Sequence, residues 1–456
     1  MKPLAKPLIL LIMLLLLMIP LMLVEGVVQE RASYRDVAVQ NIAASWTGPQ
    51  TLNGPFLVVD YHANEYQRRW DKNLDKYVVT PKKVKKRTLI RPTDSQIATE
   101  LEVSFRHRGI YDVPVYKADI RMTGSFDLQH IHRVLSAENE PSIDRISIET
   151  GVSDARGITG VPELQWNKQT LKGEPGVSYH KNAQGFHAVI DHRANANKSG
   201  IIDYSGSFSL RGINLISIRP AGFDSRIDMQ SNWRHPSFQG DFLPDFREVN
   251  DKGFQSSWTV SSLASGNSLA PEVIRRDADF TTIQHTRTMG VQLFQPVDIY
   301  TLGDRATKYG VLFILVTFTL FYLIELMKGE RLHPIQYSLV GMALAIFFLL
   351  LLSFSEHIGF GVAYLIASVA CVGMITLYTR SMMSGKQAVL IGVTLSVLYF
   401  TCYVILQLEG FALLVGSLLL FGLLACVMYI TRKIDWYKLS SGLAEERGWV
   451  KKESTG

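Results

Sequence analysis

Long runs of apolar residues occupy the C-terminal part of the chain, and short polar segments separate them. A transmembrane helix needs about 20 predominantly apolar residues, and six runs come close to that length or reach it. The six predicted spans are residues 8–24, 309–327, 335–354, 359–379, 388–407 and 411–430. The pattern predicts a membrane protein with an N-terminal transmembrane anchor helix at 1–27 and a C-terminal five-helix transmembrane bundle at 306–433.

Residues 28–305 show a different pattern. Apolar and polar residues alternate there in short runs, for example in ELEVSF at 100–105 and in RIDMQSNW at 226–233. A period of two is typical of strands that bury one face, and the Gly, Asn, Asp and Pro residues between the runs predict turns. We therefore predict a large, mainly-β and sandwich-like domain at 28–305.

The first apolar run has a second interpretation, the core of a secretory signal. Lys2 and Lys6 precede it as they would in a signal. The run is longer than a usual signal core, however, and the EGVVQERASYRD segment that follows contains no typical cleavage site. We expect an anchor that is retained.

Lys and Arg in the short loops predict which side of the membrane each segment faces. The segments after spans three and five contain no Lys or Arg. Those after spans two, four and six contain Lys328, Arg331, Arg380, Lys386, Arg432 and Lys433. Basic short loops stay in the cytoplasm. The prediction is that both termini, including a tail at 434–456, are cytoplasmic and that the β domain lies outside.

Charge and cysteine content add two constraints. The net charge is +6, and no basic face combined with stacking aromatic residues is evident, so we do not expect a nucleic-acid partner. The three cysteines, Cys371, Cys402 and Cys426, all lie in the apolar part. The β domain therefore has no disulfide and must be stabilised by an ordinary hydrophobic core.

The segment LLSFSEHIGF at 351–360 places Glu356 and His357 side by side at the outer end of the third span. One interpretation is a polar turn that caps the next helix, and the other is a functional pair. Adjacent residues do not share a helix face, so the two alone do not predict a metal site. We expect the pair to lie in a tight outer loop and to contact the base of the β domain, with a mainly structural role.

Glu325 lies near the inner end of the second span. An ionisable residue within a span is a functional candidate, but Lys328 and Arg331 are close enough in the sequence for local pairing. No other Asp, Glu, Lys or Arg lies in the interior of a predicted span. This scarcity disfavours an ion-coupled transporter.

The segment HPSFQGDFLP at 235–244 combines two prolines with Gly240. Residues before proline favour extended backbone, and glycine permits a positive φ. We predict a rigid loop that packs Phe238 and Phe242 on the sheet. The alternative is the rim of a ligand site, to which His235 and Gly240 would belong.

A cationic segment at 81–92 is the last candidate. Its basic residues include Lys82, Lys83, Lys85, Lys86 and Arg87. One interpretation is a solvated hairpin tip or sheet edge, which lysines commonly protect from pairing. The other is an electrostatic contact with anionic headgroups or an acidic partner.

Four segments resemble elements of the CreD family of bacterial inner-membrane proteins: FRHRGIYDVPVYKADI (105–120), SNWRHPSFQGDFLP (231–244), KYGVLFILVTFTLFYLIELM (308–327) and the stretch at 333–360. The resemblance covers nearly the whole chain. It implies a multi-pass protein of the bacterial inner membrane with a periplasmic β domain. It further implies association with envelope integrity, altered sensitivity to colicins and β-lactams, and membership of a two-component regulon, but no catalytic activity or ligand that can be assigned to residues.

Three functions follow from these observations. We favour a non-enzymatic envelope protein, anchored in the lipid bilayer, whose periplasmic domain binds a periplasmic protein or an envelope glycan without any cofactor. One alternative is a transporter or lipid-handling protein, since very short loops join the spans. The other is an enzyme that acts on an envelope polymer through His235 or the Glu356–His357 pair. The residues indicate no particular oligomeric state.

Overall fold

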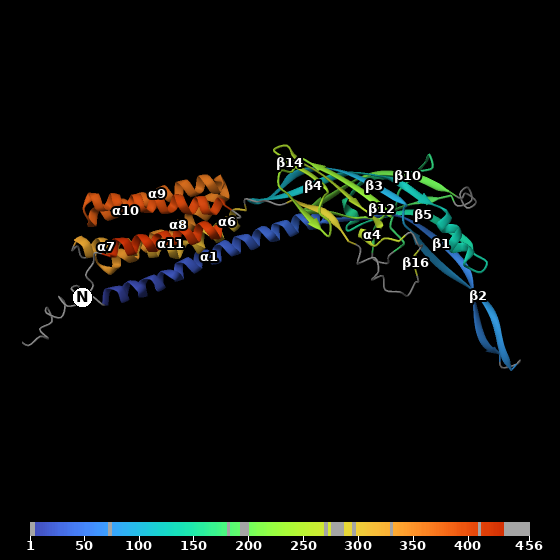
Figure 1. Cartoon of the computed structure of the whole chain (residues 1–456), viewed down its shortest axis with the longest axis horizontal. Helices are drawn as coiled ribbons and strands as arrows, with labels where there is room; N and C mark the ends of the chain where they lie inside the picture. The colour runs from blue at the N-terminus through green and yellow to red at the C-terminus, as the bar shows by residue number, and fades with distance from the viewer. Residues whose placement is uncertain are drawn as a thin grey trace, which may run out of the picture. The chain divides into compact units, whose positions relative to one another are not determined.

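A computed structural model describes residues 5–71, 75–179, 183–191, 200–268, 272–274, 287–293, 298–328, 332–408 and 412–432. The chain divides into two compact units, one formed by residues 1–36 with 297–456 and the other by residues 37–296. The first is helical and the second is mainly β (Figure 1). The predicted fold class, an N-terminal apolar helix, a large mainly-β domain and a C-terminal bundle of apolar helices, is confirmed.

The β domain is a sandwich of two sheets. The nine-stranded sheet has the order β13-β17-β11-β1-β5-β9-β8, with β2 paired to β1 and β16 paired to β2. Its strands are β1 (Gln50–Asp71), β2 (Lys76–Ile90), β5 (Ser142–Val152), β8 (Glu174–Pro175), β9 (Gln184–Ile190), β11 (Leu215–Arg219), β13 (Pro236–Gly240), β16 (Glu272–Ile274) and β17 (Met289–Leu293).

The eight-stranded sheet has the order β14-β15-β12-β3-β4-β10-β6-β7. Its strands are β3 (Asp94–Arg108), β4 (Tyr111–Asp127), β6 (Ile158–Trp166), β7 (Gln169–Lys172), β10 (Ile201–Ile213), β12 (Asp224–Ser231), β14 (Phe246–Asn250) and β15 (Gly253–Val260). Most neighbours are antiparallel, but β3 pairs with β12 in parallel, as β1 does with β11. Short helical segments connect some strands: α2 (Gln129–Ser136), η1 (Ala155–Gly157) and α4 (Ser262–Ser265).

The core of the β domain forms between the two sheets. Alternate residues of each strand point inward, as along β3, where Ile97 and Leu101 are buried and Gln96, Ala98 and Glu100 are exposed. Both sheets contribute to one continuous apolar cluster, including Leu57 and Val59 of β1 and Ile227 and Met229 of β12. The period-two pattern therefore encodes both the strands and the face that each one buries.

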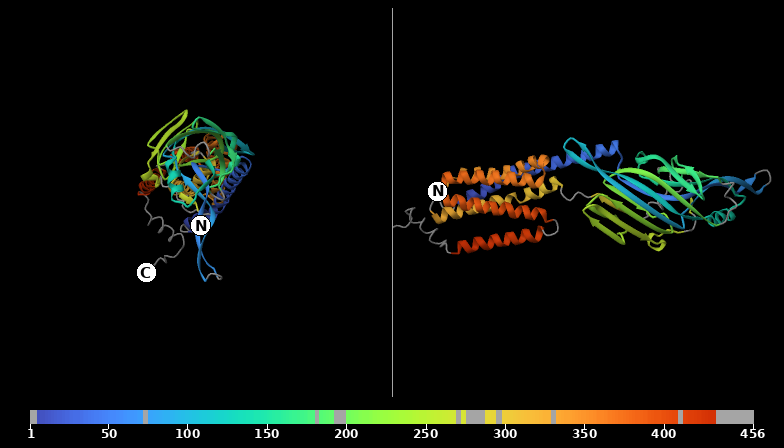
Figure 2. Two further views of the ribbon diagram at one scale, coloured as in Figure 1. Left: turned by 90° about the vertical axis from the view of Figure 1, so that its right-hand side faces the viewer. Right: turned by 90° about the horizontal axis from the view of Figure 1, so that it is seen from above.

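The helices of the other unit are α1 (Ala5–Ser45), α6 (Ile299–Lys308), α7 (Gly310–Lys328), α8 (Pro334–Ile358), α9 (Phe360–Met382), α10 (Gly385–Gln407) and α11 (Ala412–Thr431). Among the described residues, five helices are long and apolar enough to cross a membrane: α1, α6–α7, α8, α9 and α10. The apolar part of α11, Leu414–Tyr429, is shorter. Helices α8, α9 and α10 run side by side (Figure 2). The predicted tail at 434–456 lies outside the described residues.

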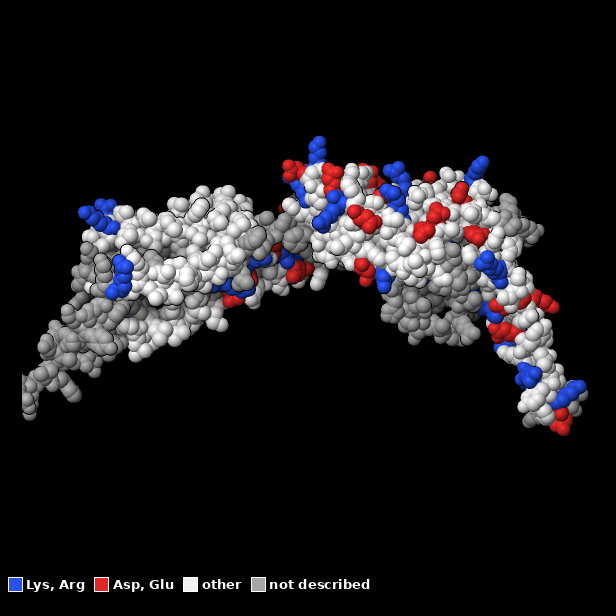
Figure 3. Space-filling view, in the orientation of Figure 1, with Lys and Arg blue, Asp and Glu red and all other residues white. Residues whose placement is uncertain are grey.

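On the face shown in Figure 3, the charged side chains of the helical unit gather toward its ends, and the surface between them carries none. Such a band is what a lipid environment requires, because charged groups within the hydrocarbon are costly. Local sequence signals fix several helix ends. The backbone N–H of His333 donates to the Gln336 side chain at 2.9 Å at the start of α8, and Gly359, with φ of +80°, ends that helix.

Helix α1 continues well beyond the apolar run that predicted an anchor at 1–27. Its second half lacks proline and glycine after Gly26 and is rich in residues that favour helix, so nothing in the sequence ends it before Ser45. Residues from Val37 onward belong to the β unit. There Ile42 packs with Val113, Val115 and Ile213 in a small apolar cluster.

The HPSFQGDFLP segment differs partly from its prediction. Phe238 and Phe242 pack against the core as expected. The predicted loop is wrong for Pro236–Gly240, which is strand β13 and pairs with β17 at the edge of the sheet. Proline is tolerated there because the first residue of an edge strand need not donate a ladder hydrogen bond.

We predict that Gly240→Ala destabilises the protein. Gly240 has a φ of +108°, and a Cβ at this position would lie 2.3 Å from the carbonyl oxygen of Thr288. The expected loss is about 1–3 kcal/mol, measured as a lower melting temperature of the purified protein. Gly48→Ala is the control, since a Cβ there meets nothing within 4 Å. Equal melting temperatures for the two variants would contradict the prediction.

Candidate functional site

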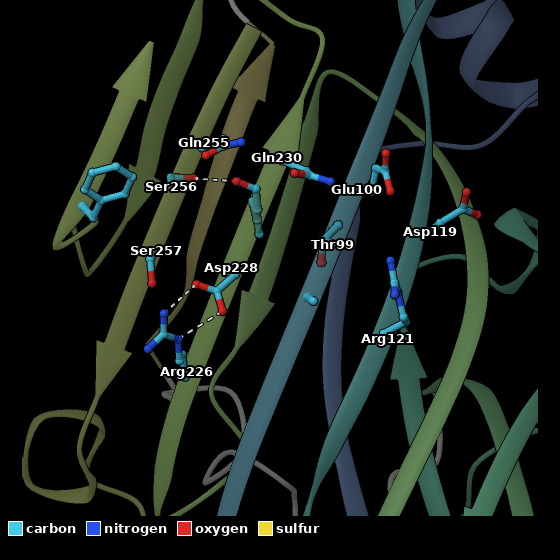
Figure 4. A pocket seen from close by; sticks show the side chains of 13 residues that line it. Thr99, Glu100, Asp119, Arg121, Arg226, Asp228, Gln230, Gln255, Ser256 and Ser257 are labelled. Atoms are coloured by element: carbon cyan, nitrogen blue, oxygen red, sulfur yellow. Dashed lines mark hydrogen bonds and ion pairs between the residues drawn. The ribbon is translucent and has the colours of Figure 1, made fainter.

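A groove of about 450 Å³ crosses the outer face of the eight-stranded sheet (Figure 4). Its lining comes from β3, β4, β12, β14 and β15: Ala98, Thr99, Glu100, Asp119, Arg121, Arg226, Asp228, Met229, Gln230, Phe246, Gln255, Ser256 and Ser257. Apart from a few that form the floor, these side chains point away from the core. The groove is therefore a feature of the solvent-facing side of the sandwich.

The hollow arises from one small residue. Strand register places Asp228 beside Ala98, and Ala98 beside Arg121, so that the three lie in one row across the sheet. Neighbouring outward positions on β3 hold the longer side chains of Gln96 and Glu100. Because Ala98 has only a methyl group, the row is open at its centre and walled by longer polar side chains.

Charges of both signs line the groove. The Arg226 Nε atom lies 3.1 Å from the Asp228 carboxylate. Asp119 accepts a hydrogen bond from the Ser209 hydroxyl, which, together with the positive charges of Lys117 and Arg121, holds the pKa of Asp119 below its usual range. Asp119 is therefore ionised at neutral pH.

Two charged groove residues are not held in a described ion pair. In the part of the chain that the structure describes, neither Glu100 nor Arg121 forms an ion pair with another side chain. Gln230, Gln255 and Ser257 add neutral donors and acceptors beside them, and the Phe246 ring is exposed at one end. The arrangement suits an extended, polar and nearly neutral ligand that can donate and accept hydrogen bonds at many points.

The groove contains no histidine or cysteine. Within the described ranges, no group of three or more His, Cys, Asp or Glu side chains is arranged to hold a metal ion. The lining supplies hydroxyl, amide, carboxylate and guanidinium groups.

None of the residues predicted as site candidates lines the groove. The sequence did predict outward-facing polar side chains on the strands that line the groove, because apolar and polar residues alternate in ELEVSF and RIDMQSNW. What the sequence does not reveal is that β3 and β12, more than a hundred residues apart, are parallel neighbours. The groove exists only through that pairing.

Glu356 and His357 lie in the last turn of α8, so the prediction of a loop at these positions is wrong. The helix simply continues to Gly359. The Glu356 carboxylate accepts a hydrogen bond from the Tyr300 hydroxyl at 3.2 Å and lies 3.8 Å from the Arg31 guanidinium. The described partners of Glu356 thus lie on α1 and α6. His357 is exposed and does not share them.

Close to this group in sequence, Arg35 and Asp298 form a second ion pair, 2.6 Å apart. It also joins α1 to the segment that begins α6. At the end of the helical unit that holds Glu356, paired charges and a tyrosine hydroxyl therefore connect α1, α6 and α8. This arrangement supports a structural role for Glu356.

Glu325 pairs with a residue that sequence proximity does not indicate. Its carboxylate forms an ion pair with Lys6 of α1 and accepts a hydrogen bond from the Tyr337 hydroxyl at 3.1 Å. These contacts join α1, α7 and α8. The side chains of Lys328 and Arg331, the partners suggested by local pairing, lie outside the described residues.

His235 is exposed immediately before β13, and its carbonyl oxygen accepts a hydrogen bond from the Trp233 indole at 3.0 Å. Gly240 ends the same strand. Both lie on the edge of the nine-stranded sheet, whereas the groove belongs to the other sheet. The structure does not bring them together with the groove.

The cationic segment separates into two groups on β2. Lys86 pairs with Glu65 and Glu138, and Arg87 pairs with Asp60, so both are held by the domain. The side chains of Lys82, Lys83 and Lys85 are exposed.

The comparisons with known proteins agree with this architecture. The family model described as "Inner membrane protein CreD" matches residues 2–437. The chain is 35% identical over 431 residues to "Inner membrane protein CreD" of Escherichia coli strain K12, with 92% of this chain and 91% of that protein covered.

The chain belongs to the CreD family. The resemblance seen in its sequence segments is thereby confirmed, and family membership together with the apolar helices supports a multi-pass inner membrane protein. The descriptions of the CreD family and of its Escherichia coli member name an inner membrane protein and no reaction.

Two solved structures found by comparison of folds resemble the chain only weakly. An M1 zinc metallopeptidase from Deinococcus radiodurans has a TM-score of 0.20 at 8% identity and covers 44% of this chain and 42% of its own. The Fcho1 Mu homology domain from Danio rerio has a TM-score of 0.16 at 10% identity and covers 45% and 80%. Likenesses at this level carry no argument about function.

We predict that Glu356→Gln lowers the melting temperature of this CreD-family protein in detergent. The glutamine amide would keep an acceptor for Tyr300 but would remove the negative charge that Arg31 faces, at an expected loss of about 1 kcal/mol. The control is His357→Asn, which removes an exposed side chain and should leave the melting temperature unchanged. The prediction fails if the two variants melt alike.

Proposed function

We propose that the protein is a non-enzymatic component of the bacterial envelope whose β domain binds a neutral stretch of envelope glycan in the groove on the eight-stranded sheet. The observation that carries the proposal is the hollow at Ala98, walled by polar side chains of both signs. The helical unit, in this proposal, anchors the domain in the inner membrane with the groove in the periplasm.

The chemistry of the lining supports a glycan. A sugar chain presents hydroxyl and amide groups along its length, each of which can donate or accept a hydrogen bond. Gln230, Gln255 and Ser257 offer both functions, and Glu100 and Arg121 offer stronger charge-assisted bonds. Because the acids and bases nearly balance, the groove does not require a strongly charged ligand.

The shape of the groove supports an extended ligand. The outer face of a sheet is open at its ends, and the Ala98 hollow lies between long side chains on several strands. A polymer can therefore cross it without its ends being enclosed. The exposed ring of Phe246 at one side offers an apolar surface of the kind on which sugar rings stack.

The two alternative functions receive less support. An enzyme that uses His235 or the Glu356–His357 pair would need these residues at a substrate site, and neither belongs to the groove. For a transporter, two acidic groups of the helical unit are already engaged, Glu325 with Lys6 and Glu356 with Arg31. We further propose that glycan binding underlies the associations that the family resemblance implies, with envelope integrity and with colicin and β-lactam sensitivity.

We predict that Ala98→Leu weakens binding to isolated peptidoglycan sacculi. The full-length protein in detergent should co-sediment with sacculi, and the larger side chain should fill the hollow and weaken binding at least about tenfold. Ala98 is exposed, so the variant should melt at the wild-type temperature.

The matched control is Thr170→Leu, which adds a similar side chain to the exposed edge strand β7 of the same sheet. It should bind sacculi as the wild type does. Unchanged binding by Ala98→Leu, or no binding by the wild type, would refute the proposed function.

The proposed orientation makes a separate prediction. The test uses a variant without the three native cysteines, in cells whose outer membrane is permeabilised and whose inner membrane is intact. In these cells, a cysteine at Thr170 should react with a membrane-impermeant maleimide. A cysteine at Ser384, between α9 and α10, should react only after the inner membrane is opened. Reversed labelling would overturn the topology.

A further inference from the structure

Strands β1 and β2 extend beyond the sandwich as a two-stranded arm (Figure 1). From Glu65 to Trp70 on β1, and from Tyr77 to Lys83 on β2, almost every side chain is exposed. A two-stranded ribbon alone buries little surface and is only marginally stable in water. The arm therefore presents side chains to solvent that the fold of the domain does not use.

Strand register divides these side chains between two faces. The pairs Trp70–Tyr77, Arg68–Val79, Tyr66–Pro81 and Asn64–Lys83 project from one face, because directly opposed residues share a face and the period is two. We name this the aromatic face of the arm. The other face carries the pairs Arg69–Val78, Gln67–Thr80 and Glu65–Lys82.

The apolar side chains of the aromatic face are exposed to solvent. Tyr66, Trp70, Tyr77 and Val79 are 56%, 46%, 67% and 51% exposed. The Trp70 and Tyr77 rings contact each other edge to face, with centroids 5.0 Å apart. Three aromatic rings, Val79 and Pro81 thus form a continuous apolar strip along the arm.

The charge on this face has one sign. Arg68 and Lys83 lie among the apolar residues, and the four pairs contain no Asp or Glu. In the described part of the chain, Arg68, Lys83 and the neighbouring Lys82 and Lys85 form no ion pair, in contrast to Lys86 and Arg87 at the base. The positive charge is therefore available to an external anion.

We propose that the aromatic face of the arm binds the surface of an anionic phospholipid membrane. Trp and Tyr rings favour the headgroup region, where their apolar and polar parts are both accommodated, and Arg and Lys pair with lipid phosphates. An arm that lies flat on the bilayer places all five apolar side chains and both cations at the same depth. The proposal is independent of the groove, which lies on the other sheet.

Addition of a partner strand to the arm is disfavoured by its own residues. Pro81 has no N–H to donate, and lysines on an edge strand oppose pairing with another strand. The one-sided arrangement of aromatic rings, by contrast, gives no advantage to edge pairing but suits a planar surface. These features favour a membrane over a peptide.

The test uses the full-length protein in phosphatidylcholine nanodiscs, immobilised through a C-terminal tag. Vesicles of phosphatidylcholine alone, or with about 30% phosphatidylglycerol, are passed over it. The wild type should capture the anionic vesicles, and the capture should decline as salt is raised. Empty nanodiscs and neutral vesicles give the background.

Two variants test the face. The double variant Arg68→Gln with Lys83→Gln should bind anionic vesicles about tenfold more weakly. Tyr66→Ser, which leaves the Trp70–Tyr77 contact intact, should also weaken binding. It should change the salt dependence of vesicle capture less than the double variant does. The matched control, Lys172→Gln with Lys252→Gln, removes two exposed cations elsewhere on the β domain and should bind as the wild type does.

The result that would overturn the proposal is equal capture of neutral and anionic vesicles, or equal capture by the arm variants and the control. Binding of the arm variants to sacculi is measured in parallel. If they lose sacculi instead of vesicles, the arm binds glycan and the membrane proposal is wrong. If they bind sacculi normally, a loss of vesicle capture is independent of the groove.

Discussion

The alternation of successive side chains between the two faces of a strand is the constraint on which the whole β domain depends. On β1 it directs Leu57 and Val59 into the core. On β3 the same rule turns Ala98 outward, where its small size opens the groove. Beyond the edge of the sandwich, where no core remains, it still separates the aromatic face of the arm from the more polar one. A shift of register by one residue would remove all three features together.

The helical unit depends on a different constraint, since charges must be paired or placed near water. Lys6 and Arg31 of α1 hold Glu325 and Glu356, respectively. From Lys6 to Arg31 the helix rises by roughly 38 Å at 1.5 Å per residue. That length is comparable to a bilayer with its headgroups, about 40–45 Å. The two ion pairs therefore fit the two interfaces, and the apolar span between them fits the hydrocarbon.

Sequence patterns predicted the elements better than the contacts between them. Apolar length identified the spans, and alternation identified strands such as β3 and β12, because both signals are local. The end of α1 was missed because helix propensity, not apolarity, carries it to Ser45. The pairing of Glu325 with Lys6 was missed because the two residues are 319 apart. The groove needed the parallel register of β3 and β12, which no local pattern encodes.

The position of β11 in the nine-stranded sheet has a consequence for biosynthesis. This strand lies between β1 and β17, and it pairs in parallel with β1, more than 150 residues earlier in the chain. Non-local pairing of this kind is slow to form and leaves strand edges open while the chain is incomplete. The sheet cannot be finished until Met289–Leu293 has been synthesised, just before Ile299 begins the next apolar helical segment. The sandwich therefore cannot be complete before the second span is about to be synthesised, and its slow strand pairing overlaps with the arrival of that span at the membrane.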